Sequence, residues 1–344
     1  MKDVAKAAGV SISSVSHVLN GTRFVSEDVV RKVEEASRDL HYTPNPIAQN
    51  LRKGKSGLIG FIVSNLENSL YVRITKGIEK TINSFGYRLL LIDSVESKKK
   101  EMENVESLCL RGVDGLIIVP TTPDCGYLEE IVRQNYPIVF IDRQPSNWDA
   151  DVVLLDNEEA SYEATKKFIA QGIREIGLVA IQFGDDDNDF VINERVSGYK
   201  KALAEAHIPY RRQYLKISTS PPATFNELRH SSAFKMTEQL LKTRVSAILS
   251  GNNYSAIGIY SCLREHHIRI PDDIAMITFD DDLWLQMNTP SISAMAQPAE
   301  ELGKLAAKRL IIRLLQQQDL PKEQFRLKAQ FIPRESSLLT RKRL

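Results

Sequence analysis

The sequence predicts an all-α helix-turn-helix domain at the N-terminus, followed by a two-lobed α/β domain built on doubly wound parallel sheets. Three observations support this fold class. Residues 1–21 hold two short helical patterns separated by a glycine, and residues 44–57 contain prolines and a basic, glycine-containing stretch. From Leu58 onward, apolar strand-like runs alternate with amphipathic segments in two successive sets, which indicates two subdomains with a cleft between them.

The length of the chain and the distribution of charge along it are more informative than the overall composition. A chain of 344 residues is too long for one core and suits a small domain joined to larger ones. The net charge is only +1, but residues 1–55 carry nine Lys and Arg against six acidic residues, so the remainder is mildly acidic. A basic head on an acidic body favours nucleic-acid contact by the head alone.

The three cysteines, Cys109, Cys125 and Cys262, have no C-x-x-C spacing, so neither a disulfide framework nor a zinc site is indicated. No apolar run approaches transmembrane length, and the polar N-terminus is unlike a signal peptide. The sequence therefore predicts a cytoplasmic protein.

The first two helices are predicted from their apolar spacing. Apolar residues recur at helical intervals in both: Val4, Ala7 and Ala8 in the first, and Val15, Val18 and Leu19 in the second. Gly9 can adopt the left-handed conformation that ends a helix and turns the chain. Ser11 is placed to cap the second helix, which Asn20 and Gly21 end.

The outer face of the second helix keeps short polar or methyl-bearing side chains near its N-terminus. Such groups can enter a DNA major groove and touch base edges. An ordinary helical hairpin is the alternative for these residues alone. The residues expected to contact DNA in this part of the chain are Ile12, Ser13, Ser14, Ser16, His17, Asn20 and Arg23.

A third helix is predicted after Ser26, its expected N-cap, with acidic residues in the first turn. Its core face is expected to hold Val30, Val33, Ser37 and Leu40. Then follows YTPNPIAQNLRKGKSGLIGFIVSN, Tyr42 to Asn65. At this point the sequence resembles the family of the lactose and purine repressors, bacterial ligand-controlled transcription factors. The resemblance runs over essentially the whole chain.

Residues 44–57 form a predicted boundary. Pro44 and Pro46 bar a continuous helix, although Pro46 is acceptable at the first position of a new one. A solvated linker is the plain interpretation. The resemblance implies instead a hinge helix, Pro46 to about Arg52, which orders on operator DNA in the minor groove and wedges Leu51 between base pairs. The DNA-contacting residues expected here are Asn45, Ala48, Gln49, Leu51 and Arg52.

The α/β part is predicted from short apolar runs of the buried parallel-strand type. They lie at 58–63, 88–93, 115–119 and 137–142, and then at 175–180, 247–250 and 275–280. Amphipathic helical segments lie between them at 70–85, 98–111, 195–207 and 255–267. The resemblance implies a periplasmic-binding-protein-like domain whose chain crosses between lobes three times, near 157, 290 and 322. The expected N-lobe is 58–157 with 291–322, the C-lobe is 158–290 with 323–334, and a tail follows at 335–344.

Polar side chains follow the predicted strand ends, where doubly wound folds bind ligands. In the family that the chain resembles, the matching positions bind an effector, usually a sugar or a nucleobase. Carboxylate, amide and guanidinium groups around an aromatic ring suit a sugar. The expected effector-binding residues are Asn68, Ser69, Tyr71, Asp142, Arg143, Arg195, Asn252, Asp280 and Trp284. For Trp284, the alternative is packing in the core or at its rim. For Arg195 and Asp280, the alternative is a structural ion pair between the two.

Three features depart from the family pattern. Asn252-Asn253 stands where an Asn-Asp pair is usual, and GDDDNDFVIN (184–193) replaces a hydroxyl-rich segment before Arg195. The first helix also begins at Met1 without the few residues that normally precede it.

An acidic run, Asp185, Asp186, Asp187 and Asp189, partly fits the spacing of a calcium loop. Phe190 and Val196 stand where such a loop needs Gly and Glu, so a solvated acidic loop is expected and no metal site is predicted.

The sequence has no G-x-G-x-x-G after a strand, no P-loop and no G-x-S-x-G motif, so an enzyme is not expected. A periplasmic sugar-binding protein is disfavoured by the DNA-binding head, and an architectural DNA protein needs no cleft domain. The sequence predicts a homodimeric repressor without a cofactor, which binds a palindromic operator under control of a sugar-like effector. A regulator activated by a nucleobase or sugar phosphate as co-repressor is the alternative. The tail has no sustained heptad repeat, so no tetramerising coiled coil is expected.

Overall fold

The structure is a computed structural model that describes residues 1–20, 23–42, 55–133, 136–146, 150–183, 189–219, 225–315 and 320–338. The chain forms two compact units, Met1–Gly57 and Leu58–Leu344. In these ranges no helix is long and apolar enough to cross a membrane.

The N-terminal unit packs three described helices around a small core: α1 (Lys2–Ala8), α2 (Ile12–Asn20) and α3 (Glu27–Asp39). Gly9 follows α1 with a φ of 63°, a left-handed conformation that glycine adopts without steric cost, and the chain turns there into α2. Val4, Val15 and Val33 contribute one fully buried side chain from each helix. The helix-turn-helix prediction is therefore confirmed.

Two details of α3 differ from expectation. Ser26 occupies the N-cap position, but its side chain makes no capping hydrogen bond, so the acidic residues Glu27 and Asp28 are what complement the helix dipole. Leu40 is 46% exposed and lies outside the core, because α3 ends at Asp39 and the chain leaves the helical spacing there. Ala36 is buried on this face instead.

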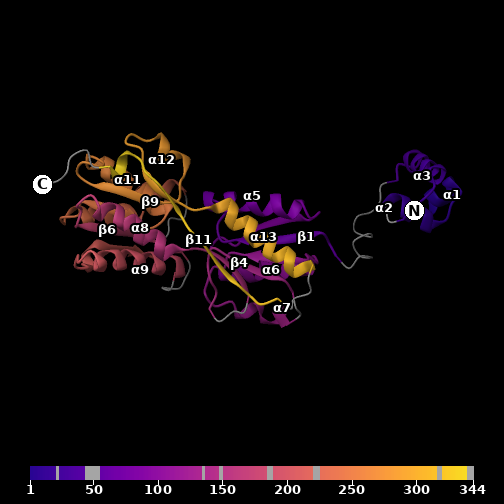
Figure 1. Ribbon diagram of the computed structural model, residues 1–344, viewed down its shortest axis with the longest axis horizontal. Coiled ribbons are helices and arrows are strands. Elements are labelled where there is room, and N and C mark those ends of the chain that lie inside the picture. Colours follow the sequence, from indigo (N-terminus) through magenta and orange to yellow (C-terminus); the bar gives the residue numbers. More distant parts are fainter. Residues whose placement is uncertain are drawn as a thin grey trace. The chain divides into compact units, whose positions relative to one another are not determined.

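The larger unit contains two sheets (Figure 1). The first, which defines the N-lobe, has the order β11-β5-β4-β3-β1-β2, and every neighbouring pair is parallel. Its strands are β1 (Leu58–Val63), β2 (Arg88–Asp93), β3 (Gly115–Ile118), β4 (Ile138–Ile141), β5 (Asp151–Leu155) and β11 (Gln324–Leu327). One face is covered by α5 (Ser69–Asn83) and α13 (Ala299–Leu315), the other by α6 (Lys98–Leu110), η1 (Gly126–Leu128) and α7 (Glu129–Arg133).

The second sheet defines the C-lobe and has the order β12-β10-β9-β8-β6-β7. Its strands are β6 (Ile176–Ile181), β7 (Leu215–Ser218), β8 (Ala247–Ser250), β9 (Ala275–Phe279), β10 (Ser293–Ala296) and β12 (Gln330–Ile332), with β12 antiparallel to β10. Two helices, α8 (Asn157–Ile169) and α9 (Phe190–Glu205), cover one face. The other face is covered by α10 (Ser232–Leu241), α11 (Asn253–Glu265) and α12 (Leu283–Met287). Short 3-10 turns are η2 (Arg212–Tyr214), η3 (Phe225–His230) and η4 (Glu335–Ser337). The predicted two-lobed, doubly wound α/β fold is confirmed.

Burial follows the position of each strand in its sheet. The central strand β1 has five buried residues of six, as expected for a strand with neighbours on both sides and helices on both faces. Strand β2 has none, because it lies at the sheet edge. The expectation that residues 88–93 form a buried strand is therefore wrong.

The lobe crossings lie at different positions from those expected. Strand β10 belongs to the C-lobe sheet and β11 to the N-lobe sheet. The chain therefore crosses after Leu155, after Ala296 and after Leu327, and the expected crossings near 290 and 322 are wrong. The predicted N-lobe range 291–322 and the predicted C-lobe range 323–334 are therefore also wrong.

Helices α5 and α13 lie against each other in near backbone contact (Figure 1). A Cβ atom added to Gly77 would lie 2.1 Å from the carbonyl oxygen of Glu300, and one added to Gly303 would lie 2.2 Å from that of Ile74. Any larger residue at either position would force these helices apart. This close packing holds the middle of α5 against α13, and the start of α5 carries residues of the candidate site.

Candidate functional site

In the N-terminal unit, the outer side of α2 is the candidate nucleic-acid interface. The Ser11 hydroxyl accepts a hydrogen bond from the Ser14 amide at 3.0 Å and caps the helix as predicted. The hydroxyls of Ser13 and Ser14 both lie within hydrogen-bond distance of that same hydroxyl, at 2.7 and 2.9 Å. Their side chains therefore have a local role at the helix start in addition to any DNA contact.

The other predicted residues of this unit are accessible to differing degrees. Ile12 is 44% exposed, Arg23 is exposed, and Ser16 and His17 are half-buried. Asn20 is the last residue of α2. The hinge residues Asn45, Ala48, Gln49, Leu51 and Arg52 lie outside the described residues, so the expected hinge helix stays a prediction.

In the larger unit, a cavity of about 480 Å³ lies among loops that follow the strands of both lobes. Ligand sites of doubly wound folds lie at such carboxyl ends of strands. Seven of the predicted effector residues line it: Asn68, Tyr71, Asp142, Arg143, Arg195, Asn252 and Asp280.

Two of the lining carboxylates occupy corresponding positions in the two lobes. Asp142 directly follows β4 and Asp280 directly follows β9, with φ angles of 69° and 68°. Each donates its backbone N–H to the neighbouring strand, to Val153 O at 2.9 Å and to Met295 O at 3.1 Å. Left-handed backbone is uncommon for residues other than glycine. At both positions it ends the strand, and both side chains line the cavity.

The Asp142 carboxylate belongs to a buried chain of hydrogen bonds. Tyr71 donates its hydroxyl hydrogen to Asp142 Oδ2 at 2.9 Å and accepts one from Ser64 Oγ at 3.1 Å. Burial raises the pKa of Asp142, while neighbouring Arg143 and the Tyr71 hydrogen bond act against the rise. Burial, and next the charge of Asp142, also raise the pKa of Tyr71. This tyrosine therefore acts as a neutral donor.

Arg143 is held by a carboxylate that the sequence reasoning missed. Its two terminal nitrogens donate to Glu96 Oε2 and Oε1 at 2.7 and 2.8 Å, the paired geometry that fits a guanidinium to a carboxylate. Glu96 lies in the loop after β2 with a φ of 52°. No local motif marks such a residue, because its position depends on that left-handed turn and on the neighbouring strand.

Arg195 and Asp280 lie in the cavity wall without pairing directly. Arg195 donates to Asn157 Oδ1 at 2.9 Å and to the Gly251 carbonyl, and its guanidinium stacks on Phe279 at 3.8 Å. Asp280 accepts from Gln297 Nε2 at 2.7 Å. Among the described residues no ion pair joins Arg195 to Asp280, so the structural ion-pair alternative is wrong. Burial lowers the pKa of Arg195 and raises that of Asp280.

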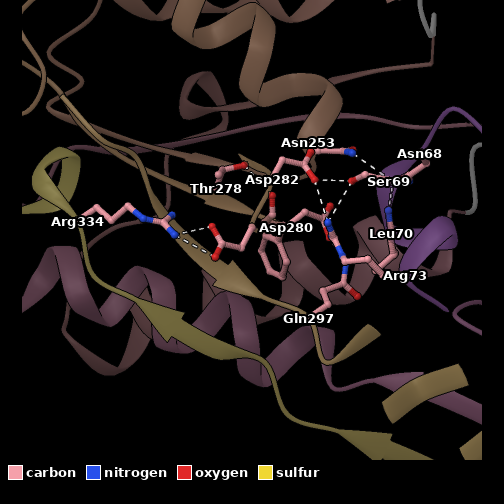
Figure 2. A network of polar contacts seen from close by, with 12 residues as sticks. Asn68, Ser69, Leu70, Arg73, Asn253, Thr278, Asp280, Asp282, Gln297 and Arg334 are labelled. Carbon is pink, nitrogen blue, oxygen red and sulfur yellow. Dashed lines mark hydrogen bonds and ion pairs between the residues drawn. The ribbon is translucent and has the colours of Figure 1, made fainter. Parts of the chain in front are cut away.

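The cavity is bounded by a polar network that joins the lobes (Figure 2). Asn68, the N-cap of α5, accepts from Leu70 N at 3.0 Å and from Asn253 Nδ2 of the C-lobe at 3.1 Å. Asp282 of the C-lobe accepts from the Ser69 hydroxyl and, at 3.2 Å, from Arg73 Nη1. These contacts hold the two lobes together beside the cavity.

Two predicted effector residues do not line the cavity. Ser69 contacts Asp282 across the lobes instead. Trp284 lies against Tyr260, with ring centroids 5.7 Å apart, at the edge of an apolar cluster of the C-lobe. The packing alternative that was weighed for Trp284 accounts for this position.

Several lining residues were not predicted. They are Leu70, Glu96, Phe183, Asp189, Val191, Ile192, Asn253, Tyr254 and Gln297. Phe183 could have been found from its place just after a strand end. Gln297 could not, because strand β10 before it was not recognised.

Three of these additional residues carry polar atoms without a partner. Asn253 Oδ1, the Tyr254 hydroxyl and Gln297 Oε1 are buried and make no hydrogen bond within the described part of the chain. An unsatisfied buried polar atom costs about 1–3 kcal/mol. A ligand rich in hydrogen-bonding groups would supply the missing partners.

The acidic run gives no sign of a metal site. Asp185, Asp186 and Asp187 lie outside the described residues, whereas Asp189 caps α9 by accepting from Ile192 N at 3.1 Å. Among the residues that are described, no group of three or more His, Cys, Asp or Glu side chains is arranged to hold a metal ion.

Comparisons with known proteins agree with this architecture. The family model described as bacterial regulatory proteins, lacI family, matches residues 1–45, and the periplasmic binding protein-like domain matches residues 165–337. The ribose operon repressor of Escherichia coli is 32% identical over 92% of this chain and 93% of the relative. The transcriptional repressor PurR of Yersinia pestis is 32% identical over 93% of this chain and 92% of the relative.

Solved structures give the same result. A lac repressor dimer bound to operator and the anti-inducer ONPF matches with a TM-score of 0.83 and 25% identity, covering 98% of each chain. A LacI family regulator of Enterococcus faecium with bound ribose matches with a TM-score of 0.68 and 26% identity, covering 81% of this chain and 98% of that one. The two domains and the cavity agree with these relatives, and the chain therefore belongs to the LacI family of bacterial regulatory proteins.

Proposed function

We propose that this protein is a transcriptional repressor whose operator affinity is controlled by a sugar bound in the cavity of the larger unit. The observation that carries the proposal is the pair of buried carboxylates, Asp142 and Asp280, at corresponding strand ends of the two lobes. A ligand that bridges them contacts both lobes at once, so its binding favours one arrangement of the lobes over another.

The chemistry of the lining suits a polyhydroxylated molecule. Each sugar hydroxyl both donates and accepts a hydrogen bond. Asp142 and Asp280 accept, the Arg195 guanidinium donates, and the unpartnered Asn253, Tyr254 and Gln297 oxygens accept. The Enterococcus faecium regulator was solved with bound ribose, and the Escherichia coli relative is named for the ribose operon, which supports the same ligand class for this chain.

On the DNA side, two copies of the chain would bind the half-sites of a palindromic operator as a homodimer. The exposed start of α2 would enter the major groove, and successive half-sites would lie about one helical turn apart. The operator-bound lac repressor dimer supports this arrangement. The hinge contact of Leu51 in the minor groove stays part of the proposal. Such a regulator works in the cytoplasm, needs no cofactor and catalyses no reaction.

The test combines ligand screening with operator binding. Purified protein is heated with a panel of sugars, sugar phosphates and nucleobases, because a ligand of the native state raises the melting temperature. The expected result is a shift with a sugar, and release from operator DNA with the same sugar in a gel-shift titration. A shift with a nucleobase alone, with tighter operator binding, would replace the proposal by the co-repressor alternative.

A further inference from the structure

A second contact between the lobes lies beside the first lobe crossing. Arg326 of β11, in the N-lobe, donates from Nη1 to Glu194 Oε1 of α9, in the C-lobe, at 2.7 Å. The Arg326 guanidinium also lies 5.8 Å from the ring centre of Phe190, which packs against an apolar cluster of the N-lobe. None of these residues takes part in the contact of Arg73 with Asp282, so this is a separate place where the lobes are joined.

The N-lobe side of this contact is fixed by the backbone of the crossings. Strand β11 pairs in parallel with β5, and Arg326 lies opposite Leu154 in that pairing. Where both strands end, the Asp156 amide donates to the Leu327 carbonyl at 2.8 Å, which joins the first crossing to the third. Arg326 is therefore part of the N-lobe at the point where the chain enters the C-lobe.

On the C-lobe side, two neighbouring residues of α9 face different surroundings, because successive side chains of a helix project about 100° apart. Arg195 is buried and lines the effector cavity. Glu194 lies outside that cavity and contacts Arg326. One turn of α9 therefore carries both a candidate effector residue and a contact with the other lobe.

The buried side chain of Asn157 connects these two neighbours. Its Oδ1 accepts from Arg195 Nε at 2.9 Å. Burial raises the pKa of Glu194, whereas the Arg326 and Asn157 side chains, within hydrogen-bonding reach of the carboxylate, lower it. A primary amide has an acceptor oxygen and two N–H donors, so Asn157 can serve both neighbours at once. Polar contacts thus lead from the effector cavity to the N-lobe through Arg195, Asn157, Glu194 and Arg326.

We propose that Asn157 and Glu194 are positioning residues that couple Arg195 in the effector cavity to Arg326 of the N-lobe. Arg195 has its binding orientation while the Glu194–Arg326 pair is formed. An effector held by Arg195 favours that pair in return, because coupling between two sites is reciprocal. This inference rests on the proposed function, since it names residues that regulate the same site from outside the cavity.

The main test is Arg326→Met, which removes a charge outside the cavity and keeps a long side chain. The Glu194–Arg326 pair is partly exposed, so the melting temperature should stay near that of wild type. Calorimetry on the full-length protein with ribose, glucose, galactose and xylose identifies the sugar that wild type binds best. The affinity of the variant for that sugar should fall about three- to tenfold, the effect of one net hydrogen bond.

A second measurement needs no sugar. Spin labels at Glu103 of the N-lobe and Lys242 of the C-lobe, both exposed, report the distance between the lobes in the free protein. Arg326→Met should broaden the distribution of this distance, because it releases one contact between the lobes. Arg195→Met should broaden it too, although the contacts of Arg195 with Asn157, Gly251 and Phe279 all lie in the C-lobe.

The matched control is Lys201→Met, because Lys201 of α9 pairs with Glu158 inside the C-lobe at 3.4 Å. This variant should change neither the affinity nor the distance distribution. Glu194→Gln should act in the same direction as Arg326→Met, and the double variant should be no worse than Arg326→Met alone, because both changes break one chain of contacts.

The outcomes separate this inference from the proposed function. Wild-type affinity or an unchanged distance distribution in Arg326→Met overturns the inference, and a lowered melting temperature without these changes would make the pair structural only. If none of the four sugars binds to wild type, the proposed function fails, and the distance distributions of Arg326→Met and Arg195→Met then decide the coupling by themselves.

Discussion

Asp282 of the C-lobe and Arg73 of the N-lobe form an ion pair across the lobes, with 3.2 Å between Oδ1 and Nη1. Both side chains are partly exposed, so the pair itself contributes little to the free energy of unfolding, about 0–1 kcal/mol. Its position matters more, because Asp282 lies two residues from Asp280 in the effector cavity and also accepts from Ser69. The pair therefore connects the ligand site to the relative position of the lobes.

Asp282→Asn should weaken effector binding severalfold while changing the melting temperature little. Loss of the contact lowers the population of the closed arrangement that holds the ligand, and the apparent affinity falls by the same factor. Calorimetry with the effector found in the screen measures this. The matched control is Asp281→Asn, because the Asp281 carboxylate contacts Arg334 within the C-lobe, 2.7 Å away. If both variants bind like wild type, the interlobe pair has no part in closure.

Arg195→Ala and Asp280→Asn should each abolish the response to effector. Each change leaves a buried polar partner unmatched, at a cost of about 1–3 kcal/mol or more for charged groups. Operator binding without effector should persist, because the N-terminal unit is untouched. Gel-shift titrations with and without effector, paired with melting curves, test this. A normal response in both variants would remove these residues from the site.

Effector affinity should fall as the pH is lowered. Burial raises the pKa of both Asp142 and Asp280 above the ordinary value of 3.8, so these carboxylates lose their charge at a higher pH than exposed ones. Protonation replaces an acceptor oxygen by a hydroxyl and weakens hydrogen bonds donated by the ligand. The stability of the ligand-free protein depends on pH in the opposite direction. Because the folded state binds the protons of Asp142 and Asp280 more tightly than the unfolded state, the free energy of unfolding falls as the pH rises from 3.8 through the raised pKa. Calorimetry of effector binding to the wild-type protein at several pH values measures the first effect, and an affinity that does not change with pH would contradict it.

Asp151→Asn should destabilise the N-lobe by about 3–5 kcal/mol, the cost of leaving a buried charge unpaired. The Asp151 carboxylate is fully buried and accepts from Arg313 Nε at 2.7 Å and Arg309 Nη2 at 2.9 Å. Burial disfavours its charge, but the hydrogen bonds from Arg313 and Arg309 outweigh burial and hold its pKa below 3.8. Its contribution is therefore present above pH 3.8 and is lost as pH falls through the lowered pKa. Chemical denaturation of both proteins near neutral pH tests the loss, and the variant should lack this acid dependence.

The fold was predictable where burial on both faces makes a strand uniformly apolar, as in residues 58–63 and 247–250. Strands β5 and β10 were missed although they are largely buried. Strand β10 is SAMA, short and rich in small residues, and β5 begins with the buried charge of Asp151. Missing β10 displaced the crossing expected near 290, and missing β11 displaced the one expected near 322. These errors have one cause: pairing with distant strands, not local sequence, forms these strands.

The candidate site divides in the same way. Asp142 and Asp280 were predictable because each ends an apolar strand run, where ligand sites of this fold lie. Glu96 and Gln297 were not, because each acquires its place from a tertiary contact, Glu96 with Arg143 and Gln297 with Asp280. Ser69 lies at the start of α5, as expected, but its side chain contacts Asp282 instead of lining the cavity. The orientation of a single side chain does not follow from the local sequence.

His17→Ala should change the base preference of the protein without changing its fold. His17 lies on α2, half-buried beside the exposed start of the helix, and is absent from the core of Val4, Ala5, Val15, Val33 and Ala36. A side chain that reads a base edge contributes about 1–3 kcal/mol of discrimination at one position, repeated symmetrically in the second half-site. Selection from random DNA should therefore return an operator relaxed at one symmetric pair of positions, while the melting temperature stays near that of wild type. Val15→Ala is the contrasting control: it removes a fully buried side chain, so it should lower stability and weaken binding to all sequences alike. An unaltered sequence preference in the His17 variant would make His17 a surface residue without a part in recognition.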